Sequence, residues 1–503
     1  MPRAAVLVLA LIFLSGAAVH AAPDAGPDPQ AVALVTAALR AQGGEARLRA
    51  IEAVRVRWVG YRNMLEQSIR PDGPYIPEFW TGTDLRDQRR GRLHQTGTGK
   101  VYVGDGEGFD DPLDLTADAT AAVQRAGGKA SPDARQVAPS RERLALSPER
   151  LLLTALAAGD LRRLPPAVVQ GQTHEVVGFS LDGAPVRLYL DRRSKLPVGY
   201  DYSGPLARSG YWSFRGDHTV RTVFSNWALQ ADGVRLPMQI DDYGDGRLDR
   251  NWMIDRIEIN PRLDEAEFAI PPEARAAAIA APAATTAALK AQELAPGVLL
   301  LAGSWNVVIV RQADGLVVLE APISSAYSER VIRTAAERFP GAPIKAVIST
   351  SDSWPHIAGL RPYVARGVPV YLLDLNLPAV SSIVANPHTN PPDTLQQRPR
   401  KPVFRPVTAP LSLGVGENRL ELIPLRGLNT ERQMMVYLPG QRLLYASDAF
   451  QPKDADHYYT PEQVLEVAQA VARAHLDIDR AVLMHLGVTP WTKIVGSLPK
   501  AAR

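Results

Sequence analysis

The first half of the chain alternates apolar and polar residues with a period of two. This alternation is clearest at residues 54–58, 186–190 and 256–259. A period of two places successive side chains on opposite faces of a strand, so each segment predicts a half-buried strand. Helical spacing of apolar residues occurs at residues 31–41 and again around residues 148–156. Residues 30–272 are therefore expected to form a twisted antiparallel sheet with helices against it.

The second half alternates short apolar strands with helices. After an Ala-rich stretch at residues 273–292, which we interpret as a linker or a loosely packed helix, a second domain is expected at residues 293–503. A helix is expected at residues 328–339, where Val331 and Ala335 lie on one face. Strands are predicted at residues 298–302, 307–310, 317–319, 346–350 and 368–372.

The N-terminus has the three parts of a secretory signal peptide. It begins Met-Pro-Arg, continues with an apolar run at residues 4–14 and ends in Val-His-Ala at residue 21. A membrane anchor would need ~18 or more apolar residues, so residues 1–21 are expected to be removed on export. No other segment is long and apolar enough to span a bilayer. A periplasmic or secreted location follows.

Composition narrows the choice of partners. The 503 residues are 46% hydrophobic, carry a net charge of +3 and include no cysteine. The basic residues are scattered, whereas nucleic-acid binding needs them clustered on one face, so a nucleic-acid partner is not expected. Without cysteine there are no disulfides, and stability must come from a buried core.

A stretch with the layout of a metal-binding loop follows the strand at residues 346–349. Residues 350–359 read Thr-Ser-Asp-Ser-Trp-Pro-His-Ile-Ala-Gly. This resembles the Thr-His-x-His-x-Asp-His-x-Gly-Gly loop of the metallo-β-lactamase superfamily. In that alignment Ser351 and Ser353 replace the two histidines, Pro355 replaces the aspartate, and His356 is kept.

The later motifs of that superfamily occur in the same order. Asn429 stands where a histidine is expected, and Asp448 follows a Leu-Leu-Tyr-Ala-Ser strand. His485 stands in the final histidine-glycine motif, with Leu486 inserted before the glycine. The resemblance implies an αββα sandwich for residues 293–503, and an α+β class for the whole chain. It also implies that His356, Asp448 and His485 are the residues left to hold one ion, zinc or iron.

Two interpretations of these three residues stay open. A single-metal hydrolase would use the ion to activate water, with Asp448 orienting it, on an ester or lactone. Alternatively, His356, Asp448 and His485 are hydrogen-bonded loop residues of a domain that binds no metal. A serine nucleophile at Ser351 or Ser353 with His356 as base is a third reading, although such residues before a helix more often cap it.

The N-terminal half resembles the half-barrel of periplasmic lipoprotein carriers. The likeness rests on Ala-Gln-Gly-Gly at residues 41–44, on residues 224–237 and on the Asn-Pro to Ile-Pro segment at residues 260–271. It implies a twisted sheet that shields an acyl chain. The functions to be tested are thus a non-catalytic protein binding a small or lipidic ligand or a partner protein, a single-metal hydrolase, and an acyl-chain carrier.

Overall fold

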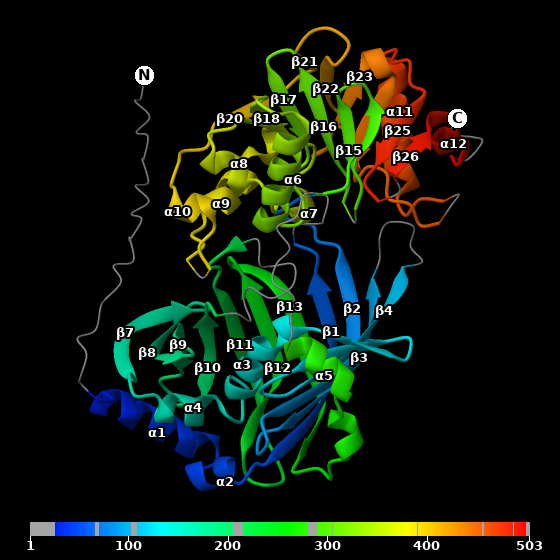
Figure 1. Ribbon diagram of the computed structural model, residues 1–503. Coiled ribbons are helices and arrows are strands. Elements are labelled where there is room, and N and C mark those ends of the chain that lie inside the picture. Colours follow the sequence, from blue (N-terminus) through cyan, green and yellow to red (C-terminus); the bar gives the residue numbers. More distant parts are fainter. Residues whose placement is uncertain are drawn as a thin grey trace, which may run out of the picture.

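The computed structural model describes most of the chain and places its strands in three sheets. The described residues are 26–65, 70–101, 108–204, 215–279, 289–303, 305–389, 391–454, 457–485 and 487–498. One sheet holds strands β1 to β13, and two further sheets hold β14 to β26 (Figure 1). The expected signal peptide at residues 1–21 lies outside the described residues. The boundaries at residues 272 and 293 stay predictions.

The first sheet is entirely antiparallel. Its strand order is β6-β5-β4-β3-β2-β1-β13-β12-β11-β10-β9-β8-β7, so the first and last strands of this half pair at its centre. The strands are β1 (Ala53–Asn63), β2 (Pro77–Asp87), β3 (Arg92–Val101), β4 (Phe109–Ala117), β5 (Ala122–Ala126), β6 (Lys129–Pro132), β7 (Arg162–Val169), β8 (Gln172–Leu181), β9 (Ala184–Leu190), β10 (Pro197–Tyr202), β11 (Val220–Leu229), β12 (Arg235–Gly244) and β13 (Arg247–Ile259). The expected antiparallel sheet is confirmed.

Short helices cover parts of this sheet. They are α1 (Pro29–Gln42), α2 (Glu45–Arg49), α3 (Val137–Ala145), α4 (Leu151–Ala157) and α5 (Pro272–Ile279). Asp28 caps α1 by accepting a hydrogen bond from the N–H of Gln30. The helix ends at Gly43, whose φ of 131° is a backbone conformation that glycine adopts readily. Apolar residues of α1 and α4 join those of the sheet in one core. The two helices expected at residues 31–41 and 148–156 are therefore confirmed.

The second half contains a seven-stranded and a six-stranded sheet. The seven-stranded sheet runs β14 (Gln292–Ala295), β15 (Val298–Leu301), β16 (Val307–Gln312), β17 (Gly315–Leu319), β18 (Ile344–Ser349), β19 (Val370–Leu373) and β20 (Phe404–Val407). The six-stranded sheet runs β21 (Leu411–Leu413), β22 (Leu420–Pro424), β23 (Met434–Leu438), β24 (Leu443–Ser447), β25 (Arg480–Leu483) and β26 (Gly487–Pro490). The strands from β17 to β20 are parallel, and so is the pair β24 and β25.

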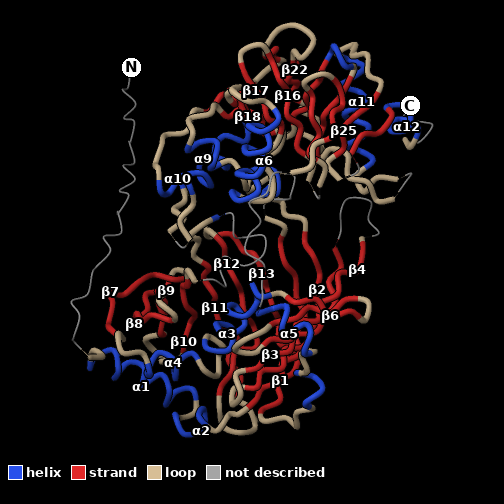
Figure 2. The backbone as a smooth tube through the Cα atoms, viewed as in Figure 1, coloured by secondary structure: helices blue, strands red, loops and turns tan. Residues whose placement is uncertain are grey.

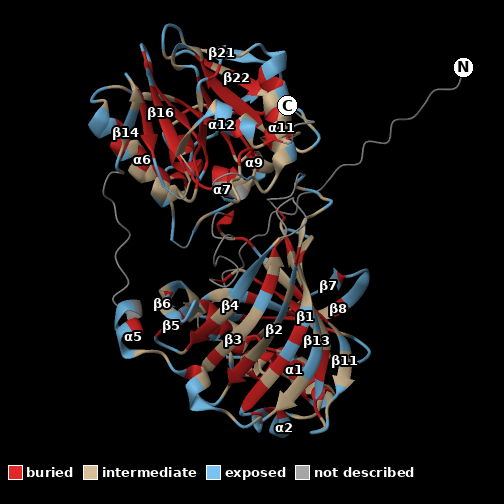
Figure 3. Cartoon of the chain, turned by 90° about the vertical axis from the view of Figure 1, so that its right-hand side faces the viewer, coloured by how far each residue is buried: buried red, intermediate tan, exposed pale blue. Residues whose placement is uncertain are grey.

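These two sheets pack face to face, with helices on their outer sides. One buried apolar cluster joins strands of both sheets, whereas two other clusters join each sheet to its own helices. The helices are α6 (Ser325–Arg338), α7 (Trp354–Ile357), α8 (Arg361–Ala365), α9 (Leu377–Ala385), α10 (Thr394–Gln397), α11 (Pro461–Arg473) and α12 (Trp491–Gly496). Figure 2 shows strands inside and helices outside, and Figure 3 shows that these strands are mostly buried. The sequence pattern predicted that α6 begins at residue 328. It begins three residues earlier, at Ser325, with Ser324 as its N-cap.

The two halves touch through polar loops. The amide N–H of Asp217 donates to the carbonyl of Pro387 at 2.8 Å, and the carboxylate of Asp217 accepts from Thr389. A second contact is the ion pair of Arg70 with Glu431 at 2.6 Å. The Pro-rich loop after α9 therefore faces the N-terminal half. No helix among the described residues has the length and apolar content to span a membrane.

Candidate functional site

The predicted site lies where strands from both sheets end. Glu320 directly follows β17 and Thr350 directly follows β18, while Asp448 directly follows β24 and His485 comes two residues after β25. Within each pair the strands are parallel, so their carboxyl ends lie at the same edge of the sheet. This topology brings together polar groups that are up to 165 residues apart, between Glu320 and His485.

The imidazole of His356 is held between two carboxylates. It is fully buried, with Nδ1 2.9 Å from Oε2 of Glu320 and Nε2 3.1 Å from Oδ2 of Asp448. The hydroxyl of Ser447 lies 3.0 Å from the same Nδ1. We call Glu320, His356 and Asp448 the buried triad. Because an ionised carboxylate only accepts hydrogen bonds, Nδ1 of His356 donates to Glu320, while Nε2 lies within ion-pair distance of Asp448 without hydrogen-bond geometry.

The electrostatics of the buried triad agree with that protonation. Burial alone would lower the pKa of His356, but the negative charges of Asp448 and Glu320 outweigh it and raise this pKa to about 10. Burial likewise tends to raise the pKa of Asp448, yet the charge of His356 dominates and holds it well below its usual range. These charges favour an imidazolium between the two carboxylates at neutral pH.

Sequence reasoning missed Glu320. Its side chain is fully buried and accepts hydrogen bonds from the backbone N–H of Thr350 at 2.7 Å, from the Thr350 hydroxyl and from His356. The available signal was an acidic residue placed directly after the apolar strand at residues 317–319. A carboxylate is rarely buried unless it is paired, so an acidic residue at position 320 predicts a cationic or hydrogen-bonding partner.

Two members of this region have strained backbones. Glu320 has a φ of 75° and Ser447 a φ of 47°, the left-handed region that residues other than glycine rarely adopt. Each such residue costs on the order of 1–3 kcal/mol, and it persists only where its surroundings hold it. Here the hydrogen bonds to His356 and Thr350 supply that constraint.

The residues that replace the superfamily histidines make internal hydrogen bonds. The hydroxyl of Ser351 accepts the N–H of Ser353 at 2.9 Å. The amide side chain of Asn429 donates to Glu466 at 3.1 Å, and the backbone N–H of Asn429 donates to the same carboxylate at 3.0 Å. Hydroxyl and amide groups are poor zinc ligands, and the side chains of Ser351 and Asn429 also have other partners.

A second cation lies beside the same loop. Arg432 donates to the carboxylate of Asp352 from Nε at 2.8 Å and from Nη2 at 2.6 Å, and also to the carbonyl of Leu375. Asp352 thus faces a guanidinium rather than the position of an ion.

The third predicted residue lies at the rim. Nε2 of His485 is 3.7 Å from Oδ1 of Asp448, its side chain is 37% exposed, and its ring meets that of Trp305 edge to face. His356, Asp448 and His485 are therefore neighbours, as the superfamily order implied. Asp448 lies closer to His356, at 3.1 Å, than to His485, at 3.7 Å.

The donor set does not fit a zinc or iron ion. A histidine ligand needs an unprotonated ring nitrogen, but both nitrogens of His356 face carboxylates. Across the described residues, no group of three or more His, Cys, Asp and Glu side chains is arranged to hold a metal. The serine hypothesis needs the ring of His356 beside the hydroxyl of Ser351 or Ser353. The described contacts of this ring are with Glu320, Asp448 and Ser447, and Ser353 meets His356 only through the backbone, where its carbonyl accepts the His356 N–H at 2.9 Å.

Comparison with known proteins gives structural neighbours only. No protein-family model matches the chain, and no curated protein matches it either. Solved structures that are similar include a metallo-beta-lactamase from Pontibacter korlensis, with 16% identity, a TM-score of 0.34 and coverage of 42% of this chain and 97% of the other. A metallo-beta-lactamase from Erythrobacter litoralis has 14% identity and a TM-score of 0.33, with coverage of 41% of this chain and 93% of the other. The inverting sec-alkylsulfatase Pisa1 from Pseudomonas sp. has 16% identity and a TM-score of 0.32, with coverage of 42% of this chain and 41% of the other.

These neighbours are proteins of the metallo-β-lactamase fold, and they cover less than half of the chain. Identities and TM-scores this low leave function open. The proposals that follow are built from the strand order and the side-chain contacts.

Proposed function

We propose that this chain is an exported, non-catalytic binding protein whose second half is a metallo-β-lactamase-like domain without metal. The observation that carries the proposal is the imidazole of His356, which lies between Glu320 and Asp448. In this proposal an internal cation takes the place of the ions that the superfamily motif would bind. The location is periplasmic or secreted, on the evidence of residues 1–21.

Strand order supports the sandwich assignment. Two mixed sheets pack on each other with helices outside, and the motif positions fall at the ends of β17, β18, β24 and β25. That is the layer order of an αββα sandwich with its site at one edge. For the first half, the continuous antiparallel sheet with α1 and α4 against it supports a lipoprotein-carrier-like half-barrel.

Charge balance explains how such a site stays folded without metal. Carboxylates gathered at one edge of a sandwich repel each other if left alone, and a buried unpaired charge is strongly destabilising. The imidazolium of His356 neutralises Glu320 and Asp448, and Arg432 neutralises Asp352. The residues at the edge are thus paired by protein cations.

The same geometry argues against the single-metal hydrolase. In that hypothesis His356 is a metal ligand, which needs a ring nitrogen with a free lone pair, whereas Nδ1 faces Glu320 and Nε2 faces Asp448. Asp448 is occupied by His356 and His485. The contacts favour the reading in which these residues are structural.

Metal analysis of the purified full-length protein tests the proposal. We expect zinc and iron to be far below one equivalent per chain, and a melting temperature that neither zinc addition nor chelation changes, because a ligand stabilises only the state that binds it. The His485→Ala variant serves as the control and should contain the same background metal. One equivalent of zinc or iron that disappears in His485→Ala would refute the proposal.

A further inference from the structure

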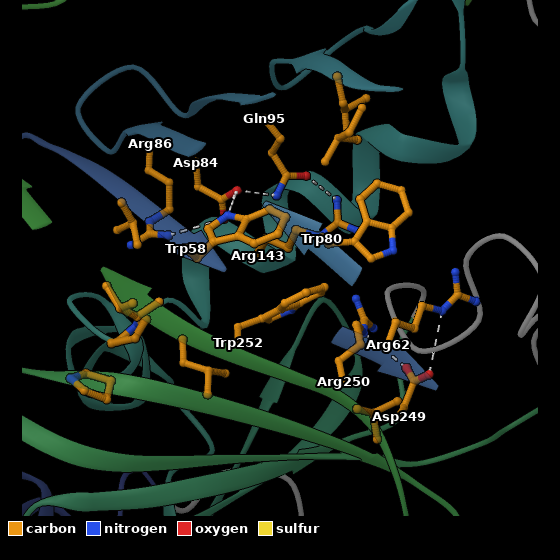
Figure 4. A pocket seen from close by; sticks show the side chains of 18 of the residues that line it. Trp58, Arg62, Trp80, Asp84, Arg86, Gln95, Arg143, Asp249, Arg250 and Trp252 are labelled. Carbon is orange, nitrogen blue, oxygen red and sulfur yellow. Dashed lines mark hydrogen bonds and ion pairs between the residues drawn. The ribbon is translucent and has the colours of Figure 1, made fainter. Parts of the chain in front are cut away.

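The concave face of the first sheet contains a cavity of about 330 Å³. It is bounded by β1 to β5, by β11 to β13 and by α3, and Figure 4 shows its side chains pointing toward a shared centre. A volume of this size is within the range of small-molecule sites. The lining combines three tryptophans and aliphatic residues with several charged side chains, so the cavity is neither purely apolar nor purely polar.

Two of the three tryptophans pack over glycines on neighbouring strands. Trp58 lies directly opposite Gly82, and Trp80 directly opposite Gly99. A Cβ on Gly82 would come within 2.4 Å of the Trp58 ring, and one on Gly99 within 2.4 Å of the Trp80 ring. Trp252 completes the wall, with its ring centre 4.6 Å from that of Trp58. Each indole therefore has a fixed place, which suits a rigid apolar surface for a ligand.

Arg143 brings a cation from α3 into this cavity. Its Nη1 donates to the side-chain oxygen of Gln95 at 3.2 Å, and it forms no ion pair with any carboxylate that the structure describes. Other cavity arginines do have carboxylate partners. These are Arg86 with Glu149 at 2.8 Å and Arg250 with Asp249 at 3.1 Å.

The surroundings make the charge of Arg143 costly. Burial, with a further contribution from the nearby Arg250, lowers the pKa of Arg143 to about 10. A guanidinium in such a place gains when an anion arrives, because charge-assisted hydrogen bonds to it are the strong ones. Gln95 is itself oriented, since its amide donates to Asp84 at 3.0 Å.

We infer that this cavity binds an amphiphilic anion, with its apolar body against Trp58, Trp80 and Trp252 and its single negative head group on Arg143. The inference rests on the binding role proposed above and specifies its ligand. A monoanion is favoured over a dianion because Asp84, Glu149 and Asp249 also line the cavity and repel additional negative charge. A neutral lipid would gain no charge-assisted contact with Arg143.

A pair of dyes that differ in charge tests the inference on the full-length protein. Anilinonaphthalene sulfonate and N-phenylnaphthylamine share one aromatic body, but only the first has an anionic group. We expect Arg143→Gln to weaken the sulfonate roughly tenfold, the loss of one charge-assisted contact, and to leave the neutral dye nearly unchanged. Arg193→Gln, in an exposed turn after β9, is the matched control and should change neither.

Displacement from the wild-type protein gives a second measurement that needs no variant. Octanoate should displace the bound sulfonate dye, whereas octanol at the same concentration should not. Equal displacement by both, or equal weakening of both dyes by Arg143→Gln, would overturn the inference. Zinc in the purified protein would refute the proposed function without changing these results, so the two failures are distinguishable.

Discussion

Replacing Glu320 with alanine is expected to lower the free energy of unfolding by about 3–5 kcal/mol, the cost of removing one partner from a buried ion pair. The change leaves His356 with a single carboxylate and removes the acceptor of the Thr350 N–H and hydroxyl. It also removes the contacts that hold the left-handed backbone at position 320. This is the largest effect expected of any single change at the site.

Urea denaturation at neutral pH measures that loss. Glu320→Gln separates charge from hydrogen bonding, because the amide oxygen still accepts from Thr350 while the negative charge is gone; its loss should be intermediate. Glu337→Ala, on the exposed side of α6, is the control and should change stability by less than about 0.5 kcal/mol. A Glu320→Ala protein as stable as the control would show that the buried triad does not stabilise the fold.

The second large effect is a loss of stability in alkaline solution that depends on His356. The pKa of this histidine is raised from 6.5 in an unfolded chain to about 10 in the folded protein. A raised folded pKa contributes stability that is complete below the unfolded pKa and is lost as pH rises through the folded pKa. The contribution of His356 should therefore fall by on the order of 3 kcal/mol between about pH 6 and about pH 9.

Comparing wild type with His356→Gln over that range isolates this contribution from the other titrating groups. The difference in unfolding free energy between the two proteins should shrink steadily as pH rises. His475→Gln, in the exposed turn after α11, is the control for replacing a histidine that lies outside the buried triad. A constant difference for His356→Gln would mean that the imidazole is neutral in the folded protein.

Sequence periodicity predicted the local elements of the first half but not how they join. The strands at residues 54–58 and 256–259 were identified because their side chains alternate. Their pairing at the centre of one sheet, with Val54 opposite Ile259, depends on contacts about 200 residues apart that no local pattern encodes. The Ala-rich stretch at residues 273–292 predicts either a linker or a loosely packed helix, and α5 (Pro272–Ile279) supports a helix in its first part.

The candidate site was predictable where a motif fixed the spacing. The order of His356, Asp448 and His485 followed from the superfamily resemblance, and the structure places them side by side. Glu320 and Arg432 belong to no motif, and the only sequence signal was the position of Glu320 directly after an apolar strand. Each gains its role only when another strand or loop brings a partner, as Asp352 does for Arg432.

The cavity of the first half was beyond sequence reasoning for a similar reason. Trp58 and Gly82 are 24 residues apart, and only the register of β1 against β2 places one over the other. Arg143 belongs to α3, a short helix that has no marked apolar stripe and that periodicity did not predict. Such sites arise from the packing of elements, so they become visible only in three dimensions.

The protonation state of His356 tests the central claim most directly. In protein labelled with nitrogen-15 at histidine, the ring-nitrogen signals absent from the His356→Gln spectrum belong to this residue. We predict that both of its nitrogens are protonated at pH 8, as an imidazolium between Glu320 and Asp448 requires. One unprotonated nitrogen at that pH, or a shift of the signals on adding zinc, would contradict the account.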